Sequence, residues 1–183
     1  MGPTRRQSQR PRLSRLLQGR RRASRRRGSS ISFGKKEMNT TAPHLRLQEA
    51  RERLGLSQDE VAVRSGMSSA EIWDIEAFED DLTCSHSPKE VQKLCQVLGI
   101  RPIDLFGSDI TEDPVSAGDL VKRIHAECAS RGITLEQFAD IVGWHLSACI
   151  APPEKLLADM TVDGLKWLCR ELRIDSRRVF LSL

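Results

Sequence analysis

Between residues 44 and 107, apolar side chains recur every three or four positions in short runs that end at glycine or proline. Leu47 and Ala50, with Leu54 one turn later, predict a first short helix whose buried face they share. Gly55 follows directly, at the place where a helix commonly ends. The pattern therefore predicts a short amphipathic helix at the start of this segment.

Serine followed three residues later by glutamate marks the start of two further helices. Ser57 and Glu60 have the spacing of a capping box, in which the two side chains satisfy free amides of the first helical turn. Ser68 and Glu71 repeat this spacing, and Gly66 stands shortly before them. The sequence therefore predicts two short helices joined by a tight turn.

Apolar faces and prolines predict the rest of this segment. Ile72 and Ile75 share one face of the third helix. An acidic stretch that we expect to be a loop follows, and Ser87 with Pro88 then starts a fourth helix. Pro102 starts one last short helical turn. The apolar stripe of the fourth helix consists of Val91, Leu94, Cys95 and Leu98.

In this order, the elements and their residues resemble the five-helix DNA-binding domain of the phage repressor and Cro (XRE) family. The resemblance covers residues 44–107 and rests on Arg51 and on the stretches LSQDEVAVRSG, MSSAEIWDIE and LCQVLGIRPIDLF. It implies an all-α fold and a transcriptional regulator whose third helix enters the major groove of double-stranded DNA. It also implies a structural ion pair between Arg51 and Glu76. The residues that it places against DNA are Gln58 at a phosphate and, in the groove, Ser68, Ser69, Ala70, Trp73 and Asp74.

The charge of this segment departs from the family pattern. Many members have a basic or amide residue where this chain has Asp74, and a basic stretch where it has Glu79, Asp80 and Asp81. Residues 44–107 carry 7 basic and 12 acidic side chains, whereas a DNA-binding domain usually shows the opposite balance. The sequence assigns these four acids no structural partner. An alternative hypothesis is therefore a protein-protein interaction module that keeps the fold, has lost DNA affinity, and docks a basic partner on its acidic third helix.

Residues 115–183 resemble a second, degenerate copy of the same unit. A shift of 77 positions aligns LSQDEVA with ITLEQFA, and a shift of 74 aligns LCQVLGIRPIDLF with LCRELRIDSRRVF. The equivalents of Arg51 and Glu76 are Cys128 and Pro153, so both partners of the implied ion pair are lost together. The shift of 77 also pairs Gly55, Ala62 and Gly66 with Gly132, Ala139 and Gly143.

The second copy is expected to lack a full recognition helix. Its counterpart of the third helix, residues 145–151, precedes Pro152 and Pro153, which disfavour a continuing helix. We therefore expect this copy to serve packing, dimerisation or partner binding. The predicted architecture is two tandem five-helix units, joined by a linker over residues 108–114.

The first 43 residues form an Arg-rich tail. Residues 1–37 contain 11 Arg and 2 Lys against one Glu, a net charge of +12, while the rest of the chain has a net charge of −8. Such a composition predicts disorder. Three interpretations stay open: a basic arm that neutralises nucleic-acid phosphates, an organellar transit peptide, or a true translation start at Met38.

The remaining sequence chemistry does not indicate an enzyme. The chain has no GxSxG, P-loop or HExxH motif and no Tyr, so neither catalytic residues nor a cofactor are predicted. Its five cysteines include no CxxC pair, which argues against a metal site, and Cys95 and Cys169 are expected to be buried. No apolar run approaches the roughly 18 residues of a membrane span, and a cytoplasmic protein is expected. Because one short helix makes few base contacts, we expect a homodimer on DNA.

Overall fold

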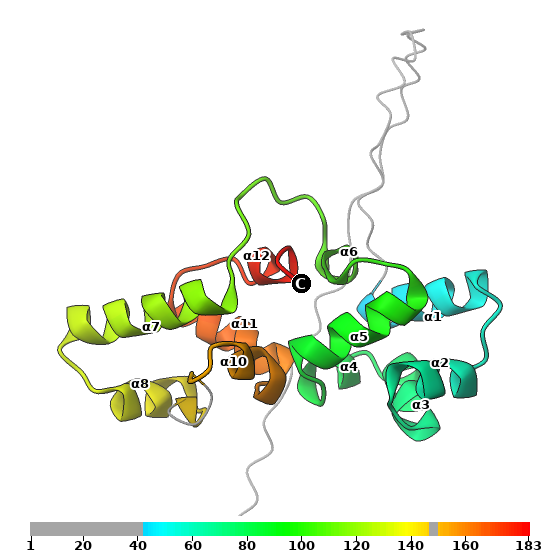
Figure 1. Ribbon diagram of the computed structural model, residues 1–183, viewed down its shortest axis with the longest axis horizontal. Coiled ribbons are helices and arrows are strands. Elements are labelled where there is room, and N and C mark those ends of the chain that lie inside the picture. The colour runs from blue at the N-terminus through cyan, green and yellow to red at the C-terminus, as the bar shows by residue number, and fades with distance from the viewer. Residues whose placement is uncertain (1–41, 147–149) are drawn as a thin grey trace, which may run out of the picture. The chain divides into compact units, whose positions relative to one another are not determined.

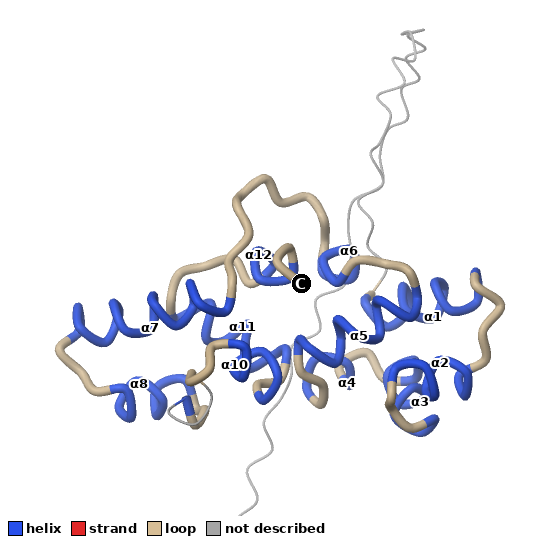
Figure 2. The backbone as a smooth tube through the Cα atoms, in the orientation of Figure 1, coloured by secondary structure: helices blue, strands red, loops and turns tan. Residues whose placement is uncertain are grey.

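The computed structural model describes residues 42–146 and 150–183, and every regular element within these ranges is a helix (Figures 1 and 2). The described residues belong to one compact unit. Residues 1–41 of the predicted Arg-rich tail, which was expected over residues 1–43, lie outside the described part, while Ala42 and Pro43 belong to the start of α1. Within the described ranges, no helix is long and apolar enough to cross a membrane.

Five of the first six helices follow the predicted order, and α4 is an addition to it. Ser57, Ser68 and Ser87 cap α2, α3 and α5, because each side chain accepts a hydrogen bond from the amide three residues later. In each case the glutamate at that position accepts a bond from the serine amide in return. The six helices are α1 (Pro43–Arg53), α2 (Gln58–Ser65), α3 (Ser69–Ala77), α4 (Asp81–Cys84), α5 (Pro88–Leu98) and α6 (Pro102–Phe106).

Two details differ from the predicted pattern. Leu54 follows α1 as its C-cap and is 48% exposed, so it does not share the buried face of Leu47 and Ala50. The acidic stretch that was expected to be a loop contains α4, which is held by the fully buried side chain of Leu82. A helix of four residues is too short for its periodicity to be recognised from sequence.

The described residues after α6 form five further helices. Thr134 and Thr161 cap α8 and α11 through their side chains. The predicted helix over residues 145–151 is described only at its ends, where the amide of Ile150 donates to the carbonyl of Leu146 at 3.1 Å. The helices are α7 (Ala117–Arg131), α8 (Leu135–Val142), α10 (Glu154–Asp159), α11 (Val162–Glu171) and α12 (Arg177–Phe180).

Among the described residues, one hydrophobic core cluster includes side chains from both sets of helices. Cys95 of α5 and Cys169 of α11 lie in it and are fully buried, as predicted. Burial raises the pKa of each thiol to about 12. Because the thiolate is the reactive form, these two cysteines act as small apolar core residues.

Candidate nucleic-acid interface

The turn between α2 and α3 is closed by hydrogen bonds at both ends. Gly66 ends α2 in the left-handed conformation (φ 76°), which glycine adopts without a steric penalty, and its amide donates to the Ala62 carbonyl at 2.9 Å. The Met67 amide donates to the same carbonyl at 3.1 Å. At the other end, the carboxylate of Glu71 accepts from the Ser68 amide at 2.7 Å. These bonds fix the direction in which α3 leaves α2.

An ion pair fastens α3 to α1. Arg51 Nε lies 2.6 Å from Glu76 Oε1, and its Nη2 donates to Oε2 at 2.8 Å. The other terminal nitrogen donates to the carbonyl of Leu56 at 2.9 Å. Both charged groups are largely buried, and the hydrogen bond with Glu76 raises the pKa of Arg51. The guanidinium therefore connects α1, the turn before α2, and α3.

Gln58, the first residue of α2, joins the same network. Its side-chain amide nitrogen donates to Glu76 Oε2 at 2.9 Å. Sequence reasoning placed Gln58 against a phosphate and did not anticipate this bond. One of its two amide hydrogens is therefore engaged within the protein, and one stays available for an external acceptor.

The face of α3 that would meet DNA carries small, aromatic and acidic side chains. Ser69, Ala70 and Trp73 are exposed, and Asp74 is partly exposed. The hydroxyl of Ser69 donates to Asp59 of α2. Sequence reasoning missed Asp59, because only the packing of α2 against α3 brings it beside the start of α3. The face thus includes a carboxylate beyond those predicted.

An exposed aromatic pair stands at the end of α3. Trp73 is 53% exposed and Phe78 is 51% exposed. Their ring centroids lie 5.8 Å apart with the planes at 85°, an edge-to-face contact. Phe78 was not predicted as a site residue. Two large exposed apolar side chains in contact form a small patch beside the acidic residues that follow α3.

The acids after α3 have different roles. Glu79 and Asp80 are exposed. Asp81 is partly buried, and its carboxylate lies 3.4 Å from Nε2 of the buried His86 while it also accepts from the Ser85 hydroxyl at 3.0 Å. The expectation that Asp81 lacks a structural partner is therefore wrong. The acidic surface beside α3 consists of Asp59, Asp74, Glu79 and Asp80.

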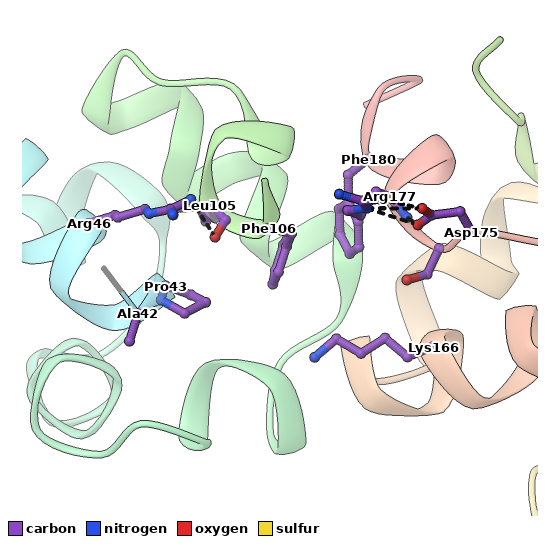
Figure 3. A pocket seen from close by; sticks show the side chains of 10 residues that line it. Ala42, Pro43, Arg46, Leu105, Phe106, Lys166, Asp175, Arg177 and Phe180 are labelled. Atoms are coloured by element: carbon purple, nitrogen blue, oxygen red, sulfur yellow. Dashed lines mark hydrogen bonds and ion pairs between the residues drawn. The ribbon is translucent and has the colours of Figure 1, made fainter. Parts of the chain in front are cut away.

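A pocket of about 470 Å³ lies elsewhere, lined by residues of α1, α6, α11 and α12 (Figure 3). Its cations already have protein acceptors: Arg46 donates to the carbonyl of Leu105, Lys166 to Asp163, and Arg177 to Asp175. Within the described part of the chain, no group of three or more His, Cys, Asp or Glu side chains is placed to hold a metal ion. The α2–α3 face is therefore the stronger candidate for a functional surface.

Comparison with known proteins agrees with this choice. Residues 45–105 match a family model described as a helix-turn-helix domain. No curated protein and no solved structure matches the chain. The matched segment begins in α1 and ends within α6, so it contains the entire α2–turn–α3 unit. Domains of this kind are typical of DNA-binding regulators and are typically not enzymes.

Proposed function

We propose that this protein is a sequence-specific, DNA-binding transcriptional regulator of the repressor/Cro type that acts in the cytoplasm and reads double-stranded DNA with α3. The observation that carries the proposal is the capped α2–turn–α3 unit, which leaves the first turn of α3 exposed. In proteins with this motif, the N-terminal residues of the second helix contact base edges in the major groove.

The side chains on α3 suit modest specificity. Ser69 can hydrogen-bond a base edge and Ala70 can touch a thymine methyl group, but neither forms a bidentate pair. Asp74 can accept only from the cytosine amino group. Trp73 offers an apolar surface, and Gln58 keeps one amide hydrogen that can reach a phosphate. Affinity should depend on several weak contacts rather than on one dominant pair.

We further propose that residues 115–183 are a degenerate second copy of the helix-turn-helix unit. The bounds of α8 follow those of α2 at a shift of 77. At a shift of 74, α11 begins where α5 begins and ends one residue sooner. Gly66 and Gly143, at equivalent positions, both end their helices with positive φ. This agreement in helix ends and caps supports a repeat for which the sequence identity between the two halves is low.

A second candidate function is a protein-protein interaction module. It is favoured by the acidic surface beside α3 together with the exposed pair of Trp73 and Phe78. Carboxylates facing phosphates add repulsion and release no counterions, whereas they would attract a Lys- or Arg-rich protein segment. An aromatic pair in the same place would supply the apolar contact area of such an interface.

Selection from a pool of random duplexes with the full-length protein tests the two functions. If α3 reads DNA, a preferred sequence should emerge, and Ser69→Glu should reduce its affinity to that of a scrambled duplex. The new carboxylate would face the groove, and a glutamate in the first turn of a helix is favourable. Because the substitution also removes the bond from Ser69 to Asp59, unchanged helical circular dichroism must accompany the loss of binding. Ala126→Glu is the matched control, because it adds the same charge at an exposed position of α7.

Each outcome separates the candidates. Loss of specific binding with Ser69→Glu, but not with Ala126→Glu, supports DNA reading through α3. Equal effects of the two substitutions would reject the assignment of α3. The interaction module becomes the better account if no preferred duplex emerges and the protein instead binds a Lys- and Arg-rich peptide. The Ser69→Glu variant should then keep its fold.

A further inference from the structure

Equivalent helices of the two halves, residues 42–107 and 115–183, contact each other reciprocally. At a shift of 74, α4 falls within α10, α5 begins where α11 begins, and α6 overlaps α12, so these helices are counterparts. Helix α4 packs against α11, and α10 packs against α5. Helix α6 packs against its own counterpart, α12. At that contact the rings of Phe106 and Phe180, which are equivalent at a shift of 74, have centroids 4.3 Å apart. Reciprocal contacts of this kind are the signature of a two-fold interface, in which one surface meets an equivalent copy of itself.

Hydrogen bonds cross this interface at the start of α11. The amide of Val162 donates to the carbonyl of His86 at 2.9 Å. The carboxylate of Asp163 accepts from the Thr83 hydroxyl and from the Cys84 thiol, both at 3.2 Å. Val162 is the first residue of its helix, where an amide has no acceptor within the helix. It donates instead to the carbonyl of His86 in the other half.

Two copies of the N-terminal half could not form these bonds with each other. At a shift of 74, the residues equivalent to Val162 and Asp163 are Pro88 and Lys89. Proline has no amide hydrogen to donate, and an ammonium group cannot accept from Thr83 or Cys84. The polar contacts therefore favour pairing with the C-terminal half over pairing with a second copy of the N-terminal half.

We infer that residues 115–183 serve as a built-in partner subunit: they occupy the pairing surface formed by α4, α5 and α6, so the protein is a monomer that presents one α2–α3 face. This replaces the homodimer expected from the sequence. The consequence for DNA rests on the proposed function: the target is one asymmetric site read by a single α3, rather than a two-fold palindrome read by two.

The pairing can be measured on the full-length protein without DNA. Sedimentation equilibrium should give the mass of one chain, 20.6 kDa, over a wide range of protein concentration. Under the same conditions, hydrogen exchange should show the Val162 amide protected, because its acceptor is the His86 carbonyl. A dimer mass, or a monomer whose Val162 amide exchanges freely, would overturn the inference.

A charge reversal at the interface gives a second test. Asp163→Lys introduces the type of residue found at the equivalent position of the first half, and it should speed exchange of the Val162 amide by about tenfold or more. Asp159→Lys is the control, because it makes the same change at an exposed end of α10 where the carboxylate pairs with Lys155. Equal protection of the Val162 amide from hydrogen exchange in the two variants would contradict the inference.

Binding stoichiometry connects the pairing to DNA. Native mass spectrometry with a selected duplex should detect one chain per duplex. Two chains on a duplex with two-fold symmetry would overturn the single-site target. Failure to select any duplex would count against the proposed function alone, because the sedimentation and exchange measurements still decide whether the two halves pair within one chain.

Discussion

At the scale of single residues, Glu76 holds the site together. Its carboxylate accepts from Arg51 of α1 and from Gln58 of α2. The carboxylate is largely buried, so removal of one partner leaves a charge that water cannot fully solvate. The position of α3 relative to α1 and α2 therefore depends on a charge network rather than on apolar packing alone.

A double-mutant cycle measures this network. Arg51→Met and Glu76→Gln should each destabilise the protein, and their coupling energy in chemical denaturation should exceed about 1 kcal/mol, because residues in one hydrogen-bonded network are not independent. The pair Lys122 and Asp119 is the control: it is well exposed, and its coupling should stay below about 1 kcal/mol. Additive effects of the Arg51 and Glu76 substitutions would show that the pair does not support the fold.

The capping carboxylates predict a pH dependence. Hydrogen bonds from the Ser68 side chain and amide hold the pKa of Glu71 below its usual range. A carboxyl group whose pKa is lower in the folded protein stabilises it above the ordinary pKa, and this stabilisation is lost as the pH falls through the lowered value. In the Glu71→Gln variant, the free energy of unfolding should therefore change less with pH between about pH 5 and pH 3 than it does in the unmodified protein.

Helix α8 offers a matched control for that experiment. Its cap, Thr134, is paired with the neutral Gln137. Gln137→Glu should steepen the loss of stability over the same acidic range, which denaturation at a series of pH values would reveal. The capping account fails if Glu71→Gln leaves the pH dependence as it is in the unmodified protein.

At the scale of elements, two helix ends have the same geometry with different residues. Gly99 directly follows α5 and has φ 64°, and Arg173, two residues after the end of α11, has φ 55°. The backbone amides of the following residues, Ile100 and Ile174, donate to the backbone carbonyls of Cys95 and Cys169 at 3.1 and 2.8 Å. A side chain beyond glycine is strained in the left-handed region, so the second half carries a conformational cost at this position that the first half avoids.

Substitutions at these two positions should have opposite effects. Arg173→Gly should stabilise the protein by about 1 kcal/mol, and Gly99→Ala should destabilise it by a similar amount. The space around a Cβ at Gly99 is open, so the effect there is conformational rather than a clash. Midpoints of chemical denaturation give both values, and a loss of stability in Arg173→Gly would contradict the assignment.

The elements also show how far the sequence predicts this structure. The capped helices α2, α3 and α5 follow from local signals, because each serine and its glutamate lie three residues apart. Helix α4 and the bond from Gln58 to Glu76 depend on packing between segments that are distant in sequence, so periodicity did not reveal them. Asp59 joins the candidate site for the same reason, because the packing of α2 against α3 places it beside Ser69.

At the scale of the whole molecule, charge is divided along the chain. Residues 1–37 have a net charge of +12, and the rest of the chain has a net charge of −8. A basic segment binds any nucleic acid through phosphate contacts, and such binding weakens steeply as salt rises. Specific reading by α3 depends on base edges and should survive in salt better. Salt dependence therefore separates the two sources of affinity.

The most direct test of the central claim is a salt titration of the full-length protein on the selected duplex and on a scrambled duplex of equal length. The account predicts that the selected duplex stays bound more tightly than the scrambled one at about 0.15 M salt, where exposed charges are largely screened. Equal affinity for both duplexes, lost together as salt rises, would contradict it and would show that α3 does not read sequence.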